Sequence, residues 1–541
     1  MSLRVLEPEQ AAALVQDGWT VACAGFVGAG HAEAVTAAIE ERFLASGHPH
    51  GLTLVYSAGQ GDRDRRGVNH FGNPGMTEVV CGGHWRSAPR LSQLALAEQC
   101  EAWNLPQGVI THLYRAIAAG QPGLLTRVGL HTFVDPRHGL DPRYMGGAVN
   151  QRALARLKDG SSRWVQALDF RGEEALFYPR FPIHCVVLRA TAADARGNLS
   201  THGEAFHHEL LAIAQAARNS GGIVIAQVRE IVDHHQALAP IRVPGHLVDH
   251  VVLCRNPELH RITFGEQEND SYLQPWRGEA LPAVAAAAPA ALDARMLVQR
   301  RALLEIARRR PRVVNLGVGM PAAVGGLAEA AGVSGITLTV EAGPIGGTPA
   351  DGLSFGASAW PEAVVDQPAQ FDFYDGGGID LAVLGMAELD GDGNVNVSRF
   401  GAGAQASIAG VGGFINITQG ARALVFMGTL TAGGLQVQAE GGRLRIVTEG
   451  RLHKVVPAVS HLSFNAAWAA ARGVPVLYLT ERAVFELRPG TAGRPQLTVT
   501  EIAPGIDLQR DVLEQCQAPV AVAPDLALMD SRIFDAARLC V

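Results

Sequence analysis

Two stretches of the sequence, LRATAADARGNLS (188–200) and LGMAELDGDGNVN (384–396), follow the same pattern. Each begins as an apolar strand and ends in a DxxGN turn, because Asp, Gly and Asn supply the side-chain bonds and backbone freedom of a tight turn. The two aspartates are 390 − 194 = 196 residues apart, and the turn glycines and asparagines keep this spacing. The repeat predicts two related α/β domains facing one another around an interdomain cleft, which would hold the functional site.

Short β-branched runs alternate with Ala- and Leu-rich stretches along the whole chain. This is the pattern of open, mostly parallel sheets with flanking helices. We expect strands at 20–23, 52–56, 223–228, 313–316, 336–340, 423–427 and 476–479. We expect helices at 33–44, 209–217 and 293–310. The last of these helices has Asp293 as an N-cap, a basic final turn, and Pro311 to end it.

An Ala/Pro stretch at 281–292 reads as an interdomain linker. We therefore expect one domain at 1–285 and a second at 292–541. Each half also opens with a strand and a glycine-rich loop, GFVGAG (25–30) and NLGVGMP (315–321). The offset between these loops is larger than that of the turns, so the first half carries an insertion.

Composition excludes several classes of protein. The chain has 541 residues, 48% of them hydrophobic and 18% charged, enough to bury a sizeable core. Its net charge is −7 with no long basic run, which argues against a nucleic-acid partner. The N-terminus lacks the apolar segment of a signal peptide, and no apolar run is long enough to span a membrane. The seven scattered cysteines fit reduced thiols, so we expect a cytoplasmic protein.

The glycine loops favour an anionic ligand over a dinucleotide. In NLGVGMP (315–321), Pro321 is placed to begin a helix whose free N–H groups would face an anion. Neither glycine loop spells GxGxxG, and the nearest match, at 401–406, runs into further glycines instead of a helix. A dinucleotide site of the Rossmann type is therefore not expected.

Glu341 stands out in ITLTVEAGPIGG (336–347), where a strand ends in a glycine-rich turn. An acidic side chain at this end of a parallel strand lies where α/β sheets place ligands, although a surface glutamate has the same spacing. The glycines at 343, 346 and 347 would leave room for a large ligand. The segment GVGGF (410–414) would offer a second set of backbone amides.

These stretches resemble the family I coenzyme A transferases, in the single-chain branch that acts on acetate or propionate and fuses both subunit-like halves. The resemblance covers nearly the whole chain. It rests on EAGPIGG (341–347), DFYDGGGIDLAVLGMAELDGDGNVNVSRFG (372–401), GVGGFINIT (410–418), NLGVGMP (315–321), AGQGDRDRRGVNHFG (58–72), GGHW (82–85), NLPQGVI (104–110), VGLHTFVDPR (128–137) and APGIDLQRDVL (503–513). Ala342 and Ala32 depart from the family pattern, and neither removes a reactive group.

The resemblance implies an α-like domain at 1–285 and a β-like domain at 292–541, which carries Glu341 as nucleophile. Its carboxylate, ionised at neutral pH, would attack an acyl-CoA and pass through a glutamyl-CoA thioester. Coenzyme A is then a substrate, and no bound cofactor or metal is implied. Backbone amides would stabilise the oxyanions and bind CoA, and the candidates are those of Gly317, Val318, Gly319, Gly410, Gly412 and Gly413. Gln107 would hold the substrate carboxylate, with a buried turn amide as the alternative.

Other expectations concern histidines, partners and rival functions. The pairs His207-His208 and His234-His235 are expected on solvated faces and not in a metal site, because adjacent histidines point about 100° apart on a helix. His84, Trp85 and His70 would line the surface facing the cleft.

Partners would be acyl-CoA and small carboxylates, with no nucleic acid or membrane, in a homo-oligomer such as a tetramer. An acyl-CoA hydrolase and a non-catalytic acyl-CoA sensor stay open as alternatives.

Overall fold

The structure is a computed structural model, and the residues that it describes are 3–138, 143–275, 292–401, 406–490, 493–537 and 539. Contacts group the chain into two compact units. The first unit contains Met1–Pro275, Val340–Phe373 and Ser398–Asn416. The second unit contains Trp276–Thr339, Tyr374–Val397 and Ile417–Val541. The linker predicted at 281–292 lies outside the described residues except for Leu292.

The first unit is built on an eight-stranded, wholly parallel sheet. Its order is β1 (Val5–Leu6), β15 (His250–Leu253), β12 (Ile223–Val228), β9 (Cys185–Arg189), β2 (Thr20–Cys23), β3 (Leu52–Tyr56), β4 (Thr77–Gly82) and β5 (Glu101–Asn104). Strands β2, β3 and β9 are buried at every residue, as expected of central parallel strands covered on both faces.

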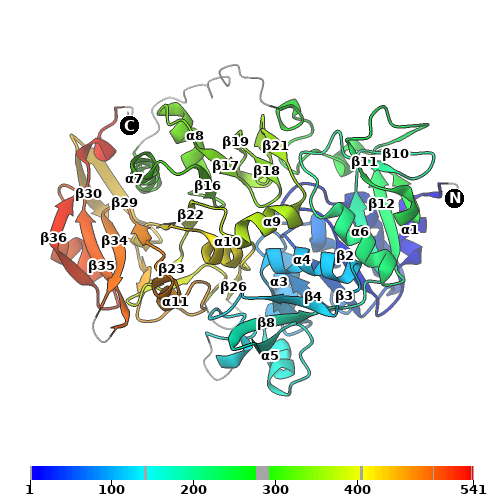
Figure 1. Ribbon diagram of the computed structural model, residues 1–541, viewed down its shortest axis with the longest axis horizontal. Coiled ribbons are helices and arrows are strands. Elements are labelled where there is room, and N and C mark those ends of the chain that lie inside the picture. The colour runs from blue at the N-terminus through cyan, green and yellow to red at the C-terminus, as the bar shows by residue number, and fades with distance from the viewer. Residues whose placement is uncertain are drawn as a thin grey trace. The chain divides into compact units, whose positions relative to one another are not determined.

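Helices cover this sheet. They are α1 (Pro8–Leu14), α2 (Glu33–Ser46), α3 (Pro89–Leu96), α4 (Gln107–Ala118), α5 (Gln151–Lys158) and α6 (Leu210–Asn219). Helices α4 and α6 pack against each other beside the strands (Figure 1). A small antiparallel sheet also belongs to this unit, with the order β6 (Gly123–Thr126), β8 (Glu173–Pro179) and β7 (Gln166–Phe170).

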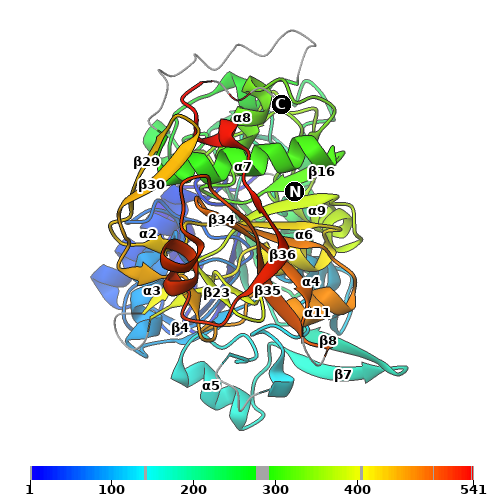
Figure 2. The same cartoon turned by 90° about the vertical axis from the view of Figure 1, so that its left-hand side faces the viewer.

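Within the second unit the main sheet runs β17 (Thr337–Thr339), β16 (Val313–Leu316), β22 (Leu381–Gly385), β27 (Leu424–Met427), β33 (Val476–Leu479), β34 (Ala483–Pro489), β35 (Pro495–Ile502) and β36 (Ala521–Leu528). The pairs from β17 to β33 are parallel, and the hairpins to β34 and β35 are antiparallel. Figure 2 shows β34, β35 and β36 as neighbouring strands. The helices are α7 (Ala294–Arg309), α8 (Ala323–Ala330) and α11 (Ala466–Ala471), and β29 (Gln436–Glu440) and β30 (Arg443–Thr448) form a hairpin.

The remaining elements are short. They are α9 (Gln367–Asp375), α10 (Phe414–Gly420), β18 (Pro344–Ile345), β19 (Thr348–Pro349), β20 (Ser358–Ala359), β21 (Ala363–Val364), β25 (Arg399–Phe400), β26 (Ser407–Ile408), β28 (Thr431–Ala432) and β31 (Leu452–His453). In the part of the chain that the structure describes, no helix has the length and apolar character needed to cross a membrane.

The internal repeat is present in the secondary structure of both units. Strands β9, β10 (Ala192–Asp194) and β11 (Leu199–Ser200) match β22, β23 (Glu388–Asp390) and β24 (Val395–Asn396). The offset is the same at every boundary: 381 − 185 = 388 − 192 = 395 − 199 = 196. In each unit the first strand lies between two parallel neighbours, and the second and third pair antiparallel. The two units therefore share a common core, as the sequence repeat predicts.

The two turns also agree atom by atom. Asp194 Oδ1 accepts hydrogen bonds from the N–H groups of Arg196 and Asn198, and Asn198 Nδ2 donates to Asp194 Oδ2 at 2.7 Å. In the second turn, Asp390 Oδ1 accepts hydrogen bonds from the N–H groups of residues 392 and 394, and Asn394 Nδ2 donates to Asp390 Oδ2. Residue 392 thus takes the place of Arg196. The aspartate thus closes each turn from its first position.

The predicted α/β class is confirmed, although the helix predicted to begin at Pro321 begins two residues later, at Ala323. Five of the seven predicted strands have the expected bounds, and the other two are shorter, at Thr337–Thr339 and Leu424–Met427. The predicted N-cap is correct: Asp293 accepts a hydrogen bond from Met296 N–H at 2.8 Å. Helix α7 ends at Arg309, and the next residue, Arg310, takes the left-handed conformation of a C-terminal cap.

Candidate active site

Glu341 follows strand β17 in a tight turn of the first unit. Val340 N–H donates to Pro344 O at 3.1 Å, and Gly343 N–H donates to Val340 O at 3.1 Å. The side chain of Glu341 is only 6% exposed, and Ala342 behind it is completely buried. The turn therefore directs a carboxylate into the protein interior and does not present it on the surface, so the reading of Glu341 as a surface glutamate is wrong.

The glycines after Glu341 serve a different purpose from the one expected. A Cβ at Gly343 would lie 2.1 Å from Val365 O, and one at Gly347 would lie 2.2 Å from Ala359 O. At Gly346 it would meet the Glu362 side chain at 2.6 Å. The expectation that these glycines leave room for a ligand is wrong, because residues of the same chain segment fill that space.

The segment GVGGF (410–414) is fixed beside GGHW (82–85) by backbone hydrogen bonds. Gly412 N–H donates to Gly83 O at 2.7 Å, and Trp85 N–H donates to Ala409 O at 2.7 Å. Two further bonds tie this segment to the end of β5 and to the start of α4. Val411 N–H donates to Asn104 Oδ1 at 2.9 Å, and the N–H of residue 107 donates to Gly412 O at 2.9 Å.

This frame brings Glu341, Gln107 and His84 around the Gly412–Gly413 pair. A Cβ at Gly413 would lie 3.2 Å from Glu341 Cγ. A Cβ at Gly412 would lie 3.8 Å from Gln107 Oε1 and 3.9 Å from His84 Cδ2. The sequence prediction placed Glu341, Gln107 and the 410–414 loop in one site, and within this unit the structure brings these three together.

Three polar atoms of this group are buried and lack a partner. Among the described residues, no hydrogen bond reaches Glu341 Oε2, Gln107 Nε2 or His84 Nδ1. Buried polar groups are nearly always paired, and exceptions mark strain, catalysis or ligand binding. Gln107 is 3% exposed and begins α4, so its unpaired Nε2 favours the ligand-binding interpretation over that of a satisfied turn amide.

Burial shifts the pKa values of Glu341 and His84. Desolvation raises the pKa of the Glu341 carboxyl to about 7. Glu341 is therefore only partly ionised at neutral pH, whereas the sequence-based expectation had it fully ionised. Desolvation lowers the pKa of His84 to about 4, and the charges of Arg86 and Arg63 add to this effect. His84 is consequently a neutral imidazole at physiological pH.

Hydrogen bonds within the protein already occupy some of the backbone N–H groups of the 410–414 loop, so fewer of them can bind an oxyanion. Gly410 N–H donates to Ser398 O at 3.0 Å, and Gly412 N–H is taken by Gly83 O. Both groups therefore already have acceptors. Gly413 N–H has no backbone acceptor within the described ranges. Because Gly413 is also the residue in contact with Glu341, its amide is the strongest oxyanion candidate of this loop.

The second glycine loop belongs to the second unit, at the end of β16. Gly317 N–H donates to Val383 O at 2.9 Å and so extends the sheet. Val318 is 49% exposed, and a Cβ at Gly319 would meet nothing within 4 Å. Of the three predicted amides, Gly317 is engaged in the fold, and Val318 and Gly319 lie at an open surface of their unit.

The expected exposure of His70, Trp85 and His208 is wrong. His70 does not line a ligand surface, because it is 8% exposed and lies between Glu33 Oε1, at 2.8 Å, and Glu40 Oε2, at 2.5 Å. Trp85 is completely buried in the core of the first unit. His208 is not on a solvated face, since it is 1% exposed.

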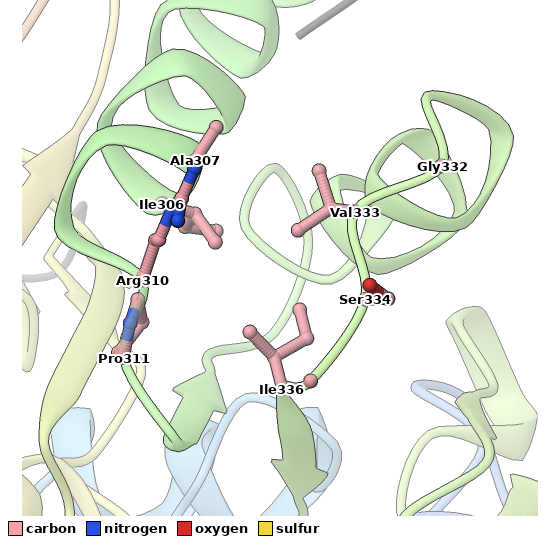
Figure 3. Close-up of a pocket in the computed structure, with 9 residues that line it drawn as sticks. Ile306, Ala307, Arg310, Pro311, Gly332, Val333, Ser334 and Ile336 are labelled. Carbon is pink, nitrogen blue, oxygen red and sulfur yellow. The ribbon is translucent and has the colours of Figure 1, made fainter.

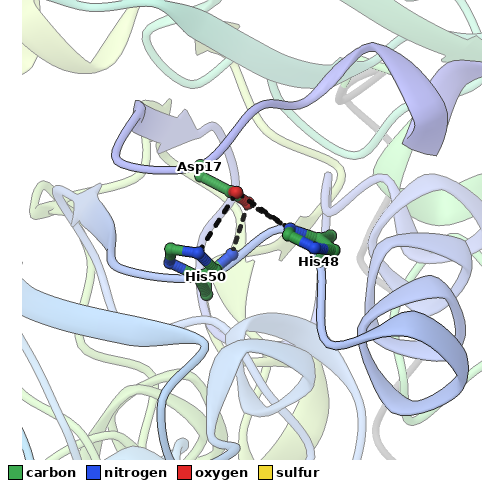
Figure 4. Close-up of side chains that lie close together, drawn as sticks. All are labelled: Asp17, His48 and His50. Carbon is green, nitrogen blue, oxygen red and sulfur yellow. Dashed lines mark hydrogen bonds and ion pairs between the residues drawn. The ribbon is translucent and has the colours of Figure 1, made fainter.

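Among the described residues, one group has metal-ligand spacing, and none of its members is a predicted site residue. Asp17 Oδ2 lies 2.8 Å from His48 Nδ1 and 3.2 Å from His50 Nε2 (Figure 4). Its other oxygen accepts a hydrogen bond from His50 N–H at 2.9 Å. All three residues are exposed, and these contacts account for the carboxylate as the closure of a surface loop.

A cavity of about 340 Å³ lies in the second unit, between the end of α7 and the loop after α8 (Figure 3). Its lining comes from residues 306, 307, 310, 311 and 332–336, with Ile306, Val333 and Ile336 directed toward it. No predicted site residue contributes to this lining. The cavity is therefore separate from the group around Glu341.

Sequence reasoning missed some residues that build the site. Asn104 holds the 410–414 loop through its side chain, and Phe371 would lie 3.2 Å from a Cβ at Gly413. Asn104 stands in the same NLPQ stretch as Gln107, which was the available signal. Outside this group, Glu209 is a second buried acid, 1% exposed, and desolvation raises its pKa to about 7. No sequence pattern indicates its burial, since it lies at the N-terminal end of an ordinary amphipathic helix.

The fold and the site define an α/β protein with a buried acid in a glycine-rich frame, and similarity to known proteins identifies its kind. A model of the coenzyme A transferase family matches residues 5–253. Caffeate CoA-transferase of Acetobacterium woodii is 41% identical over 98% of this chain and 97% of its own length. Acetate CoA-transferase YdiF of Escherichia coli K12 is 37% identical over 98% of this chain and 95% of its own. The chain belongs to the coenzyme A transferase family.

Solved structures agree with this assignment. The apoenzyme of the acyl-CoA transferase YdiF from Escherichia coli O157:H7 matches with a TM-score of 0.87 and 34% sequence identity, covering 99% of this chain and 97% of that chain. A thioester complex of the same enzyme with CoA matches with a TM-score of 0.86 at the same identity and coverage. The protein is therefore an enzyme, a CoA-transferase.

Proposed function

We propose that this enzyme transfers CoA from a short-chain acyl-CoA to a carboxylate acceptor such as acetate, by a ping-pong mechanism through a thioester on Glu341. The observation that carries the proposal is the buried Glu341 side chain beside Gly413. Its Oε2, like Gln107 Nε2 and His84 Nδ1 nearby, has no hydrogen-bond partner among the described residues. Two relatives support the reaction class, since one is an acetate CoA-transferase and the other a caffeate CoA-transferase. The related structure in a thioester complex with CoA supports a covalent route.

The first half-reaction loads CoA onto the enzyme. A Glu341 oxygen attacks the acyl-CoA carbonyl, and the C–S bond breaks to give an acyl-glutamyl anhydride and CoA thiolate. The thiolate then attacks the glutamyl carbonyl, and the C–O bond of the anhydride breaks. The products are a glutamyl-CoA thioester and the free carboxylate of the donor, so atoms and charge balance.

The second half-reaction is the same sequence in reverse with a new acid. The acceptor carboxylate attacks the glutamyl thioester and releases CoA thiolate, which then attacks the acceptor's acyl carbon. The Glu341 carboxylate leaves and the new acyl-CoA dissociates. No phosphate, redox or water-consuming step is needed, because each step exchanges one acyl derivative for another.

The neighbours of Glu341 have distinct parts in this scheme. Each step passes through an oxyanion, and one well-placed N–H donor stabilises such a charge by about 3 kcal/mol. The amide of Gly413 is placed for this role, with those of Val318 and Gly319 as further candidates for CoA or oxyanion binding. Gln107 Nε2 would hold a carboxylate oxygen of the small acid. Gly410, Gly412 and Gly317 would act by shaping the loops, since their amides are engaged.

We further propose the organisation in which this activity operates. The α-like half would span 1–285 and the β-like half 292–541, joined in one chain. The enzyme would work in the cytoplasm as a homo-oligomer, such as a tetramer, with acyl-CoA and small carboxylates as its partners. Coenzyme A would enter only as a substrate, with no permanently bound cofactor or metal.

The decisive experiment measures the fate of CoA from propionyl-CoA with and without acetate. A transferase forms acetyl-CoA in equal amount to the propionate released and liberates no free thiol. A hydrolase on the same scaffold liberates thiol without acetate, and a sensor leaves propionyl-CoA unchanged. Thiol release that is independent of acetate would overturn the proposal. A series of acyl-CoA donors of increasing length then defines the accepted acyl chain.

A further inference from the structure

We propose that His84 is a second binding residue for the small acid, and that its Nε2–H donates to a carboxylate oxygen beside the one held by Gln107. This inference rests on the proposed function and deepens it, because it assigns the group that recognises the acid. The oxygen concerned is a carboxylate oxygen in the free acid and the carbonyl oxygen in its thioester.

The position of His84 is fixed by the backbone. An isolated β-bridge pairs residue 84 with Gly410, and the bonds Gly412 N–H to Gly83 O and Trp85 N–H to Ala409 O lie on either side. A Cβ at Gly410 would lie 2.8 Å from His84 Cα, so the two segments are in direct contact. His84 therefore moves with the loop that carries the Gly413 amide.

The two ring nitrogens have different surroundings. A Cβ at Gly59 would lie 2.4 Å from His84 Nδ1, so this nitrogen is packed against a glycine, where it finds no partner among the described residues. A buried N–H without an acceptor is rarer and more costly than an unpaired lone pair. The neutral ring therefore carries its proton on Nε2 and leaves the Nδ1 lone pair against Gly59.

The Nε2 edge of the ring faces the other members of the site. Cδ2, which is bonded to Nε2, lies 3.9 Å from the Cβ position of Gly412, and Gln107 Oε1 lies 3.8 Å from the same point. His84 is partly exposed, so a ligand can reach this edge. The imidazole edge and the Gln107 carboxamide therefore border one place, and the buried Gln107 Nε2, which finds no partner among the described residues, is the second N–H donor that a two-oxygen carboxylate requires.

The local charge also favours an anion. The positive charges of Arg86 and Arg63 act on His84 and help to keep it neutral. Both arginines are exposed, and their field attracts a carboxylate to the same region. A neutral donor is suited to this task, because its hydrogen bond does not depend on pH in the range where the enzyme works.

The test compares three substitutions that differ in where a donor remains. His84→Gln places its amide near the Nε2 position, His84→Asn places it near Nδ1, and His84→Phe has none. In the second half-reaction we expect the KM for acetate to rise about tenfold or more in the Asn and Phe variants. The Gln variant should stay within about threefold of the wild type. Unfolding temperatures of all three should remain close to wild type.

A second measurement is independent of turnover. Acetate binding is titrated calorimetrically in the Glu341→Gln background, where no reaction occurs and no charge opposes the anion. Adding His84→Asn should weaken binding about tenfold, and adding His84→Gln should not. Equal affinity in the two double variants would overturn the role of His84 even if the enzyme is a transferase. Failure of CoA transfer in the wild type, with this binding pattern intact, would instead overturn only the proposed reaction.

Discussion

Gly413 contacts the side chain of Glu341: a methyl group on its α-carbon would lie 3.2 Å from Glu341 Cγ and 3.2 Å from Phe371 Cζ. This contact decides how far the carboxylate can move. The 410–414 loop is itself held by Asn104 and Gly83, so it cannot simply retreat. The residue whose amide we assign to the oxyanion therefore lies against the side chain that we assign as nucleophile.

Gly413→Ala should lower the rate of CoA transfer at least about tenfold, because the methyl group displaces the carboxylate from its attacking position. Gly413 does not require a left-handed conformation, so the free energy of unfolding should change little. The measurement is the rate of thioester formation with acyl-CoA. Adding Phe371→Leu, which opens space on the other side of the methyl group, should restore part of the rate. Full activity of Gly413→Ala alone would contradict the contact.

Glu341→Gln should abolish transfer and remove a pH-dependent loss of stability. The pKa of Glu341 is raised in the folded state to about 7, so its stabilising contribution is complete below the unfolded pKa and is lost as pH rises through 7. The variant should therefore gain stability relative to the wild type between about pH 4.5 and pH 7, by about 3 kcal/mol at most. Urea unfolding across this range measures the difference.

Glu209→Gln is the matched control for that experiment. Glu209 is also buried and has a pKa raised to about 7 by the same cause, and its Oε1 accepts a hydrogen bond from Ser57 Oγ at 2.8 Å. The stability difference should follow the same pH course, while transfer should stay within about threefold of the wild type. Loss of transfer in both variants would show that burial of charge, and not the nucleophile, controls activity.

The pH dependence of the first half-reaction should report Glu341 directly. Only the ionised carboxylate attacks, and burial raises its pKa to about 7. The rate constant kcat/KM for acyl-CoA should therefore fall about tenfold for each pH unit below 7 and level off above it. Pre-steady-state rates of thioester formation avoid contributions from the acceptor acid. A flat profile between about pH 5.5 and pH 8 would mean that the carboxylate is ionised throughout.

The sequence predicted the repeated α/β fold well because its signals are local. Apolar strands, the N-cap at Asp293 and the DxxGN turns depend on neighbouring residues, and each was found where expected. The site was predicted in part. Glu341 and Gln107 carry family motifs, whereas the burial of Trp85 and His70 and the packing against Gly343 depend on segments distant in sequence. Such long-range packing leaves no periodic trace that a single sequence would show.

The two DxxGN turns should be equally important for stability. Asp194 and Asp390 accept three equivalent hydrogen bonds, and Asp390 accepts a fourth from Val459 N–H at 3.4 Å, so Asp→Ala at either position should lower the free energy of unfolding by at least about 3 kcal/mol. Asp→Asn keeps an oxygen acceptor for the backbone N–H groups and should lose less than half of that. Denaturant unfolding of the four variants gives the comparison. Tolerance of alanine at one turn alone would break the structural equivalence of the two units.

The covalent intermediate gives the most direct test of the proposed mechanism. Incubation with acyl-CoA and no acceptor should leave CoA on Glu341 as a thioester. The thiolate is held by the rest of the bound CoA, so its effective concentration at the anhydride is very high. Borohydride should reduce this thioester to the alcohol at residue 341, with loss of activity in proportion. Hydroxylamine should form a hydroxamate at the same residue, and initial-rate plots with two substrates should be parallel.

Mass spectrometry of the peptide containing Glu341 distinguishes the three functions. A transferase keeps the adduct until a carboxylate is added, because water is not its acceptor. A hydrolase loses the adduct to water without acetate, and a sensor never forms it. The Glu341→Gln variant provides the blank, since its amide is too weak a nucleophile to attack the thioester. An unmodified wild-type peptide after acyl-CoA and borohydride would exclude Glu341 as the nucleophile, whatever the overall rate of CoA transfer.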